Sequence, residues 1–282
     1  MGTVAIVGAG AVGVAAARAL ASSGRVGRVL LVDGGGDAAA GEALDIQQSG
    51  AIDGFHTRVE GTADATRVVG CAVCILADRF GESDGEWRGD EGLALLTRTI
   101  VYLGRAPIVF AGASQADLLA KAATEAGLER QRLMGSAPVA LASSVSAIVA
   151  MEAGCSPAEV MLTVLGVPPA GFVVAWSGAS IGGHSLPRVL SPVQLGRIEA
   201  RVSRLWPPGA FGLGVSAAHV ATALLSSARR SVPVLTWLTG EFGVRNRAGT
   251  VPARLGPAGI VQIREPELTG RERVQLQTAL GE

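Results

Sequence analysis

The chain has 282 residues, of which 49% are hydrophobic, and this is enough to bury a large core and to predict one α/β unit with two lobes. Its formal net charge is +0, which disfavours nucleic acids and anionic membrane surfaces as partners. No apolar run reaches about 18 residues, so a membrane span is not expected, and the predicted location is the cytoplasm. The expected partners are a small-molecule substrate and other copies of the chain.

The first predicted elements are a strand, a glycine-rich turn and a helix. An apolar run at residues 3–7 precedes the turn, and a helix-patterned stretch ends near Ser23. In a G-x-G-x-x-G turn, the glycines permit a tight bend, close approach to a pyrophosphate and close helix packing. Free N–H groups and the helix dipole then face the anion, although a plain tight turn is the alternative. The expected cofactor contacts are Gly8, Ala9, Gly10, Ala11, Val12 and Gly13.

A second β-type run at residues 28–33 ends in Asp33, which follows Gly13 by 20 positions (33 − 13). This spacing suits a carboxylate that binds both ribose hydroxyls of a dinucleotide. The three residues after Asp33 are all glycine, so no Arg or Lys is present there to neutralise a 2′-phosphate. The expected cofactor is therefore NAD rather than NADP.

Further β-type runs near residues 56–60, 72–77, 107–111 and 132–135 alternate with Ala- and Leu-rich segments of helical spacing. Such alternation predicts a doubly wound parallel sheet of the Rossmann type. His56 is expected to open the first of these four runs.

Two of the three cysteines, Cys71 and Cys74, have the spacing of a redox pair. They fall on a strand-like run, however, where positions i and i+3 point to opposite faces. We therefore expect buried, unreactive thiols and a reducing compartment.

The regular alternation of strand and helix patterns ends at about residue 137. The sequence predicts a helix to Ala153, strands at 160–165 and 172–175, helices near 191–205 and 214–229, a β-rich stretch at 232–263 and a closing helix at 270–280. This order predicts an α+β substrate lobe. The expected domains are a dinucleotide-binding domain at 1–136 and a substrate-type domain at 137–282.

Several of these segments resemble the lactate/malate dehydrogenase family, and bacterial malate dehydrogenases above all. Residues 232–244, VPVLTWLTGEFGV, resemble the family stretch LPVAAYLEGQYGV, and residues 251–260 resemble VPVVIGANGV. The resemblance spans the whole chain and implies an NAD-dependent oxidoreductase that forms a homodimer or homotetramer. It also adds Ala77 and Ser114 to the expected cofactor site, and it places Asp78 where the family's TAG turn has a glycine.

The family's catalytic residues are missing from this chain. In the family, a His exchanges the proton, an Asp orients this His, and an Arg binds the substrate carboxylate. The matching positions hold Pro168, Leu141 and Ser146. Arg79 and Arg88 could match the arginines of the family's lid, but their segment is acidic and is expected to repel a carboxylate substrate.

Three residues remain as candidate catalytic groups. Ser216 matches a Ser or Thr of the family's substrate pocket, His219 follows it by three positions, and Arg88 lies in the lid. A surface or interface role is favoured for His56, His184 and His219, because no orienting Asp is evident. The lid carboxylates are interpreted as a solvated face, and no metal site is expected.

We therefore predict an NAD-binding, lactate/malate dehydrogenase-like protein with little or no ordinary 2-hydroxy acid dehydrogenase activity. One alternative is an active NAD-dependent oxidoreductase with a rearranged site, of malate/lactate dehydrogenase type or specific for a neutral carbonyl or alcohol. A second alternative is a non-catalytic binding or assembly protein.

Overall fold

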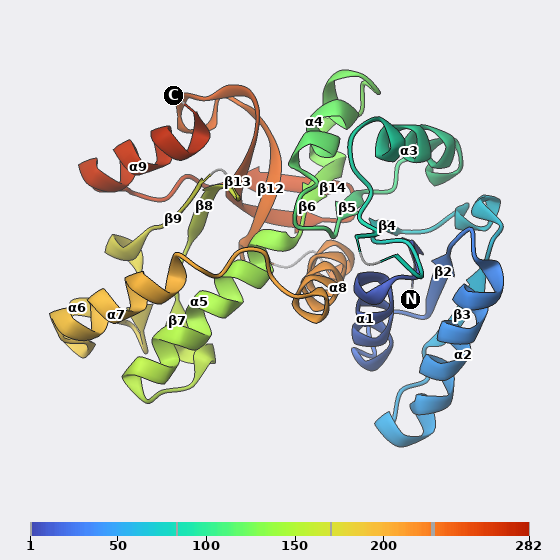
Figure 1. Cartoon of the computed structure of the whole chain (residues 1–282), viewed down its shortest axis with the longest axis horizontal. Coiled ribbons are helices and arrows are strands. Elements are labelled where there is room, and N and C mark those ends of the chain that lie inside the picture. The colour runs from blue at the N-terminus through green and yellow to red at the C-terminus, as the bar shows by residue number, and fades with distance from the viewer. Residues whose placement is uncertain (1, 83, 170, 227–228, 282) are drawn as a thin grey trace.

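The first half of the chain forms a parallel sheet flanked by helices (Figure 1). The computed structural model describes residues 2–82, 84–169, 171–226 and 229–281. The strands lie in the order β3-β2-β1-β4-β5-β6, and each neighbouring pair is parallel. This arrangement confirms the predicted doubly wound sheet. Its elements are β1 (Thr3–Val7), α1 (Ala11–Ser22), β2 (Arg28–Val32), α2 (Gly36–Asp53), β3 (Arg58–Thr62), β4 (Val73–Leu76), α3 (Gly89–Leu103), β5 (Ile108–Phe110), α4 (Ala116–Thr124) and β6 (Leu133–Gly135).

Both faces of this sheet are buried at β1, β2, β4, β5 and β6, which explains why these strands are largely apolar without alternation, whereas the edge strand β3 is polar. In β1, Val4 and Ile6 pack into a core cluster with α1, whereas Ala5 and Val7 pack into a second cluster on the other face. The second cluster includes residues of α3 and α4. Each strand thus contributes alternate side chains to two separate cores.

The second half extends the same sheet with antiparallel strands. Leu235 pairs with Gly135, and the order continues as β12-β13-β8-β9, while β11, β10 and β7 form a small separate sheet. The elements of this half are α5 (Ala137–Ala153), β7 (Val160–Met161), β8 (Val164–Val167), β9 (Gly171–Val174), β10 (Ser180–Ile181), β11 (His184–Ser185), α6 (Leu186–Val189), α7 (Pro192–Val202), α8 (Ala210–Ser226), β12 (Val232–Thr239), β13 (Arg245–Gly256), β14 (Gly259–Ile263) and α9 (Gly270–Leu280).

Some predicted boundaries were wrong. The run at 160–165 is two strands in different sheets, since β7 pairs with β10 and β8 pairs with β9. His56 is exposed and precedes β3, which begins at Arg58. The short elements β10, β11 and α6 were missed because they are only two to four residues long and have no measurable periodicity.

Helix α8 begins four residues earlier than predicted and packs directly on α1. Its glycines obscured its start, since glycine is a poor helix former. A Cβ on Gly214 would lie 2.5 Å from the carbonyl oxygen of Val12, so this glycine permits close contact between the two helices. The predicted end at 227–229 includes residues 227–228, which lie outside the described residues. Within the described ranges, no helix is both long and apolar enough to cross a bilayer.

The two neighbouring cysteines are buried as predicted, but they do not point to opposite faces. Cys71 precedes β4, so strand alternation does not govern it, and both thiols pack into the same core cluster. Burial raises the pKa of Cys71 to about 11 and raises the pKa of Cys74 well above its usual value. Both thiols are therefore protonated and unreactive at neutral pH.

Candidate functional site

The residues expected at the cofactor site meet at one edge of the parallel sheet. The glycine turn follows β1, Asp33 follows β2, Ala77 follows β4, and Ser114 lies in the turn after β5. These are carboxyl ends of adjacent parallel strands, and β1 is the switch point at which the strand order reverses. Dinucleotides bind at this place in open α/β sheets.

The glycine turn has the backbone geometry that its sequence predicts. Gly8 has a backbone φ of +110°, which residues other than glycine rarely adopt. Its N–H donates to the carbonyl of Val32 at 2.8 Å. A Cβ on Gly13 would lie 2.1 Å from the carbonyl oxygen of Gly8. Both glycines are therefore required by the bend and by the close start of α1.

The N-terminus of α1 binds a carboxylate of the chain itself. The Oδ1 atom of Asp78 accepts hydrogen bonds from the N–H groups of Val12 and Gly13, both at 3.0 Å. The N–H of Gly10 donates to the carbonyl of Asp78 at 2.8 Å, and a Cβ on Gly10 would lie 2.5 Å from the Asp78 carboxyl carbon. In this structure the second glycine therefore allows Asp78, rather than a pyrophosphate, to approach the turn.

Asp33 is also bound by backbone groups of the chain. Its Oδ1 accepts from the N–H of Gly35 at 2.9 Å, and its Oδ2 accepts from Ala9 at 2.9 Å and Phe80 at 3.1 Å. Ala9 and Gly35 belong to the two turns that a ribose-binding carboxylate would bridge. Phe80 comes from a more distant part of the chain, and its N–H occupies an acceptor that a ribose hydroxyl would use.

Asp78 and Phe80 belong to one segment, residues 78–82 and 84–88, which we call the cover segment; Ser83 lies outside the described residues. The segment folds back on itself through a bridge between Asp78 and Glu86. The Oε1 atom of Glu86 accepts from the N–H of Ser114 at 2.6 Å. A Cβ on Gly112 would lie 1.9 Å from the same oxygen. The cover segment thus also contacts the turn after β5.

The two arginines of the cover segment pair with acids of the segment itself and with Glu91 of α3. Arg88 pairs with Asp84 at 2.9 Å and Glu86 at 2.8 Å, and hydrogen bonding to Glu86 is the largest cause of the raised pKa of Arg88. Arg79 pairs with Glu82 and Glu91 and lies over the ring of Trp87. The two arginines thus pair with four of the six carboxylates at residues 78–91, and the segment keeps the predicted excess of acidic groups.

A dinucleotide does not fit this arrangement. Its pyrophosphate would need the N–H groups of Val12 and Gly13, which already bind Asp78, and it would approach a carboxylate of like charge. Among the described residues, no group of three or more His, Cys, Asp or Glu side chains is placed to hold a metal ion.

The positions matched to the family's catalytic residues lie in the second half. Leu141 is 0% exposed and packs in an apolar cluster with Val145, Val149 and Val164. Pro168 is buried directly after β8. Ala170, two residues after Pro168, lies outside the described residues. Neither Leu141 nor Pro168 has a side chain that exchanges protons.

Ser146 lines a cavity of about 660 Å³ between α5 and α8, together with Ser216 and His219. The ionisable side chains that line it within the described residues are Arg25, His219 and Arg230, so its lining is basic. Burial, followed by the charges of Arg230 and Arg25, lowers the pKa of His219. The structure thus brings Ser216 and His219 to one cavity, whereas Arg88 lies on the cover segment.

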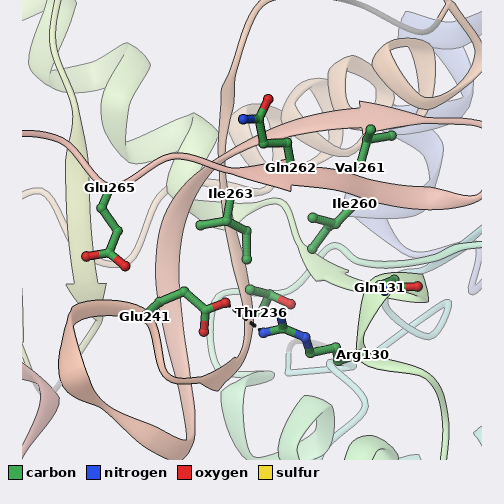
Figure 2. Close-up of a pocket in the computed structure, with 9 residues that line it drawn as sticks. All are labelled: Arg130, Gln131, Thr236, Glu241, Ile260, Val261, Gln262, Ile263 and Glu265. Atoms are coloured by element: carbon green, nitrogen blue, oxygen red, sulfur yellow. Dashed lines mark hydrogen bonds and ion pairs between the residues drawn. The ribbon is translucent and has the colours of Figure 1, made fainter.

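A second cavity of about 300 Å³ is lined by one arginine, Arg130, and two glutamates, Glu241 and Glu265. Figure 2 shows Arg130 and Glu241 pointing toward each other across it, with a separation of 2.8 Å between Arg130 Nη1 and Glu241 Oε1. Glu241 also accepts from the N–H of Thr239 at 2.8 Å. The cavity borders the start of β6, at the opposite edge of the sheet from the glycine turn. Arg130 is paired with Glu241, and we assign this cavity no function.

The fold and the glycine turn define a two-lobed α/β protein with a Rossmann-type parallel sheet. No family model matches the chain. The malate dehydrogenase of Thioalkalivibrio sulfidiphilus is 30% identical over 296 residues, which span 99% of this chain and 96% of that protein. The malate dehydrogenase of Salinibacter ruber is 27% identical and spans 99% of this chain and 93% of that protein. The chain therefore belongs to the malate/lactate dehydrogenase family.

Solved structures agree with this assignment. The malate dehydrogenase structure from Salinibacter ruber superposes with a TM-score of 0.87 at 26% identity, covering 99% of this chain and 94% of that one. The lactate dehydrogenase of Cryptosporidium parvum, solved with lactic acid and β-nicotinamide adenine dinucleotide, has a TM-score of 0.88 at 23% identity. It covers 98% of this chain and 94% of that one, and shows the shared fold.

Sequence reasoning missed the contacts that the cover segment makes with the cofactor edge. The available signal was Asp78, which stands where the family has a glycine. A carboxylate after β4 can reach the N-terminus of α1 because β1 and β4 are neighbours. The contacts of Phe80 and Glu86 had no sequence signal, since they depend on the fold of the segment.

Proposed function

We propose that this protein is an NAD-type member of the malate/lactate dehydrogenase family with little or no activity on 2-hydroxy acids. The burial of Leu141 is the observation that carries the proposal. The family's orienting Asp would stand at this position, but the surroundings are a closed apolar cluster. A carboxylate there would have no counter-charge, so the environment has adapted to an apolar side chain.

The missing groups account for a large loss of rate. Absence of a general acid or base costs about 10²–10⁴-fold. Loss of a charged hydrogen bond to the substrate carboxylate, with Ser146 in place of Arg, removes about 1.5–3 kcal/mol of binding. These losses compound without being strictly additive.

The remaining parts of the proposal follow from the family. NAD is the proposed dinucleotide, supported by the glycine turn and by Asp33 without a neighbouring cation, and its binding requires the cover segment to move. A cytoplasmic homodimer or homotetramer is the proposed state of the protein.

The test is NADH-dependent reduction of oxaloacetate and pyruvate by the purified protein, with the Salinibacter ruber malate dehydrogenase as a positive control. We expect turnover far below 1 per second, without the pH profile of a catalytic His. Turnover of about 1–10³ per second, the ordinary enzymatic range, would contradict the proposal.

A non-catalytic binding protein is the second candidate, and the basic cavity favours it. Arg25, Arg230 and His219 surround a space large enough for a small organic anion. Titration with citrate and with inorganic phosphate should give binding that Arg230→Ala weakens. The matched control is Arg229→Ala, which changes a neighbouring arginine that does not line the cavity. Equal binding by both variants would contradict this candidate.

An active oxidoreductase with a neutral substrate is supported less well. It would use Arg88, Ser216 or His219 for the proton. Arg88 is paired with Asp84 and Glu86, and the Ser216 hydroxyl donates to the carbonyl of Gly212 at 2.7 Å. A screen of neutral carbonyl compounds with NADH would test it directly.

A further inference from the structure

We propose that Asp78 is an internal substitute for the cofactor's pyrophosphate, and that it holds the dinucleotide cleft of this protein closed. The inference rests on the proposed NAD-type site but does not depend on whether the protein is catalytically active. It identifies Asp78 as the residue that sets dinucleotide affinity.

The Asp78 carboxylate occupies an anion site at the start of α1. The first N–H groups of a helix have no partner within the helix, and the helix dipole favours a negative charge beside them. Asp78 satisfies Val12 and Gly13 at 3.0 Å each. These are N–H groups at the start of α1, where dinucleotide-binding folds place the pyrophosphate.

The cover segment also contacts two more parts of the same cleft. The Phe80 N–H binds the Asp33 carboxylate at 3.1 Å, and the Glu86 carboxylate binds the Ser114 N–H at 2.6 Å. One contact thus lies at the expected ribose carboxylate and the other at the turn after β5. The segment therefore follows the cleft at three points, which a chance contact of Asp78 alone would not do.

Binding of the cofactor competes with the contacts that Asp78 makes at the glycine turn. A cofactor can bind only to molecules in which Asp78 has left the turn. Its apparent dissociation constant is then the intrinsic one divided by the fraction of open molecules. Removing the carboxylate weakens the closed state and removes a charge that repels the pyrophosphate. Both effects raise the affinity for NADH.

The experiment compares NADH binding by the wild-type protein and by Asp78→Ala, using calorimetry and NADH fluorescence. We expect Asp78→Ala to bind NADH at least tenfold more tightly, a change of about 1.4 kcal/mol. Inorganic pyrophosphate should compete with NADH on this variant. The matched control is Asp45→Ala, which removes an exposed carboxylate from α2 and should leave NADH affinity unchanged.

Two further measurements keep the test decisive. Asp78→Asn keeps an acceptor for Val12 and Gly13 while removing the charge, so it should bind NADH with intermediate affinity and serves if Asp78→Ala does not fold. In hydrogen exchange, the amides of Val12 and Gly13 should be protected in the wild type, exposed in Asp78→Ala, and protected again by pyrophosphate.

Equal NADH affinity of the wild type and both Asp78 variants would overturn the inference. So would a folded Asp78→Ala protein that binds neither NADH nor pyrophosphate. The proposed function would fail separately, by turnover of oxaloacetate or pyruvate, and NADH binding by Asp78→Ala without turnover would support both.

Discussion

The cofactor edge and the substrate lobe differ in how their candidate site residues are held. At the cofactor edge, the glycine turn and Asp33 bind the cover segment. In the substrate lobe, the positions matched to the family's catalytic residues hold Leu141, Ser146 and Pro168, and Leu141 is part of the core. A contact can be broken by one substitution, whereas a replaced group requires its surroundings to be rebuilt. The predictions below test this difference.

The largest expected effect comes from restoring the family's Asp in the substrate lobe. Leu141→Asp would bury an unpaired carboxylate among Val145, Val149 and Val164, and we expect it to lower the free energy of unfolding by about 3 kcal/mol or more. Urea denaturation measures this loss. Leu141→Met, which conserves volume and apolarity, should cost less than about 1.5 kcal/mol.

Introducing the family's catalytic residues into the substrate lobe is expected to restore little activity. The triple variant Leu141→Asp, Ser146→Arg and Pro168→His should show at most faint reduction of oxaloacetate. Strong activity from Pro168→His alone would mean that the rest of the site is intact.

Glu272 is a buried carboxylate that connects Ser177 and Thr269 within the substrate lobe. It accepts hydrogen bonds from the N–H and hydroxyl groups of Ser177 and Thr269, at 2.7–2.9 Å. Burial opposes its ionisation, but these bonds outweigh burial and lower the pKa of Glu272 to about 2. Because the folded-state pKa lies below the unfolded one, this stabilisation is present above about pH 4.5 and is lost as the pH falls toward 2.

Glu272→Gln should therefore lower the free energy of unfolding at pH 7 by about 2–3 kcal/mol. The difference from the wild type should shrink as the pH falls from 4.5 toward 2. Chemical denaturation at several pH values measures it. A difference that does not change with pH would contradict the assigned cause. Unlike Asp78, Glu272 occupies no expected ligand site, so its removal should not create dinucleotide binding.

The preference for NAD over NADP tests the role assigned to Asp33 at the cofactor edge. In the Asp78→Ala background, NAD should bind more tightly than NADP, because a 2′-phosphate would face Asp33 without a compensating cation. Adding Asp33→Ala should narrow that preference by about tenfold, or about 1.4 kcal/mol. Calorimetric titration with both cofactors measures it. An unchanged preference would show that Asp33 does not contact the ribose.

The smallest expected effect is a difference in thiol reactivity between the two halves of the chain, measured without changing the fold. Burial keeps Cys71 and Cys74 of the first half protonated at neutral pH, whereas Cys155 of the second half is partly exposed. A thiol reagent at pH 7 should therefore label Cys155 first. Peptide mass spectrometry identifies the labelled site, and early labelling of Cys71 would contradict its burial.

Local sequence determined much of this protein. The apolar runs, the glycine turn and the position of Asp33 predicted the parallel sheet and its carboxyl edge, because these features depend on residues near one another in the chain. The resemblance of residues 232–244 and 251–260 to malate dehydrogenases predicted the family. The same resemblance predicted that Pro168, Leu141 and Ser146 stand at the family's catalytic positions, but it did not predict the surroundings of these residues.

Only the tertiary structure decided how the two halves are joined and what the cofactor edge binds. The sequence predicted one α/β unit with two lobes but not how they are connected, and in the structure β12 pairs with β6 and continues the same sheet. Likewise, Asp78 is 66 residues from Val12 along the chain, and the two meet only because β4 lies beside β1. Contacts over such separations depend on strand order and side-chain direction, which local periodicity does not encode.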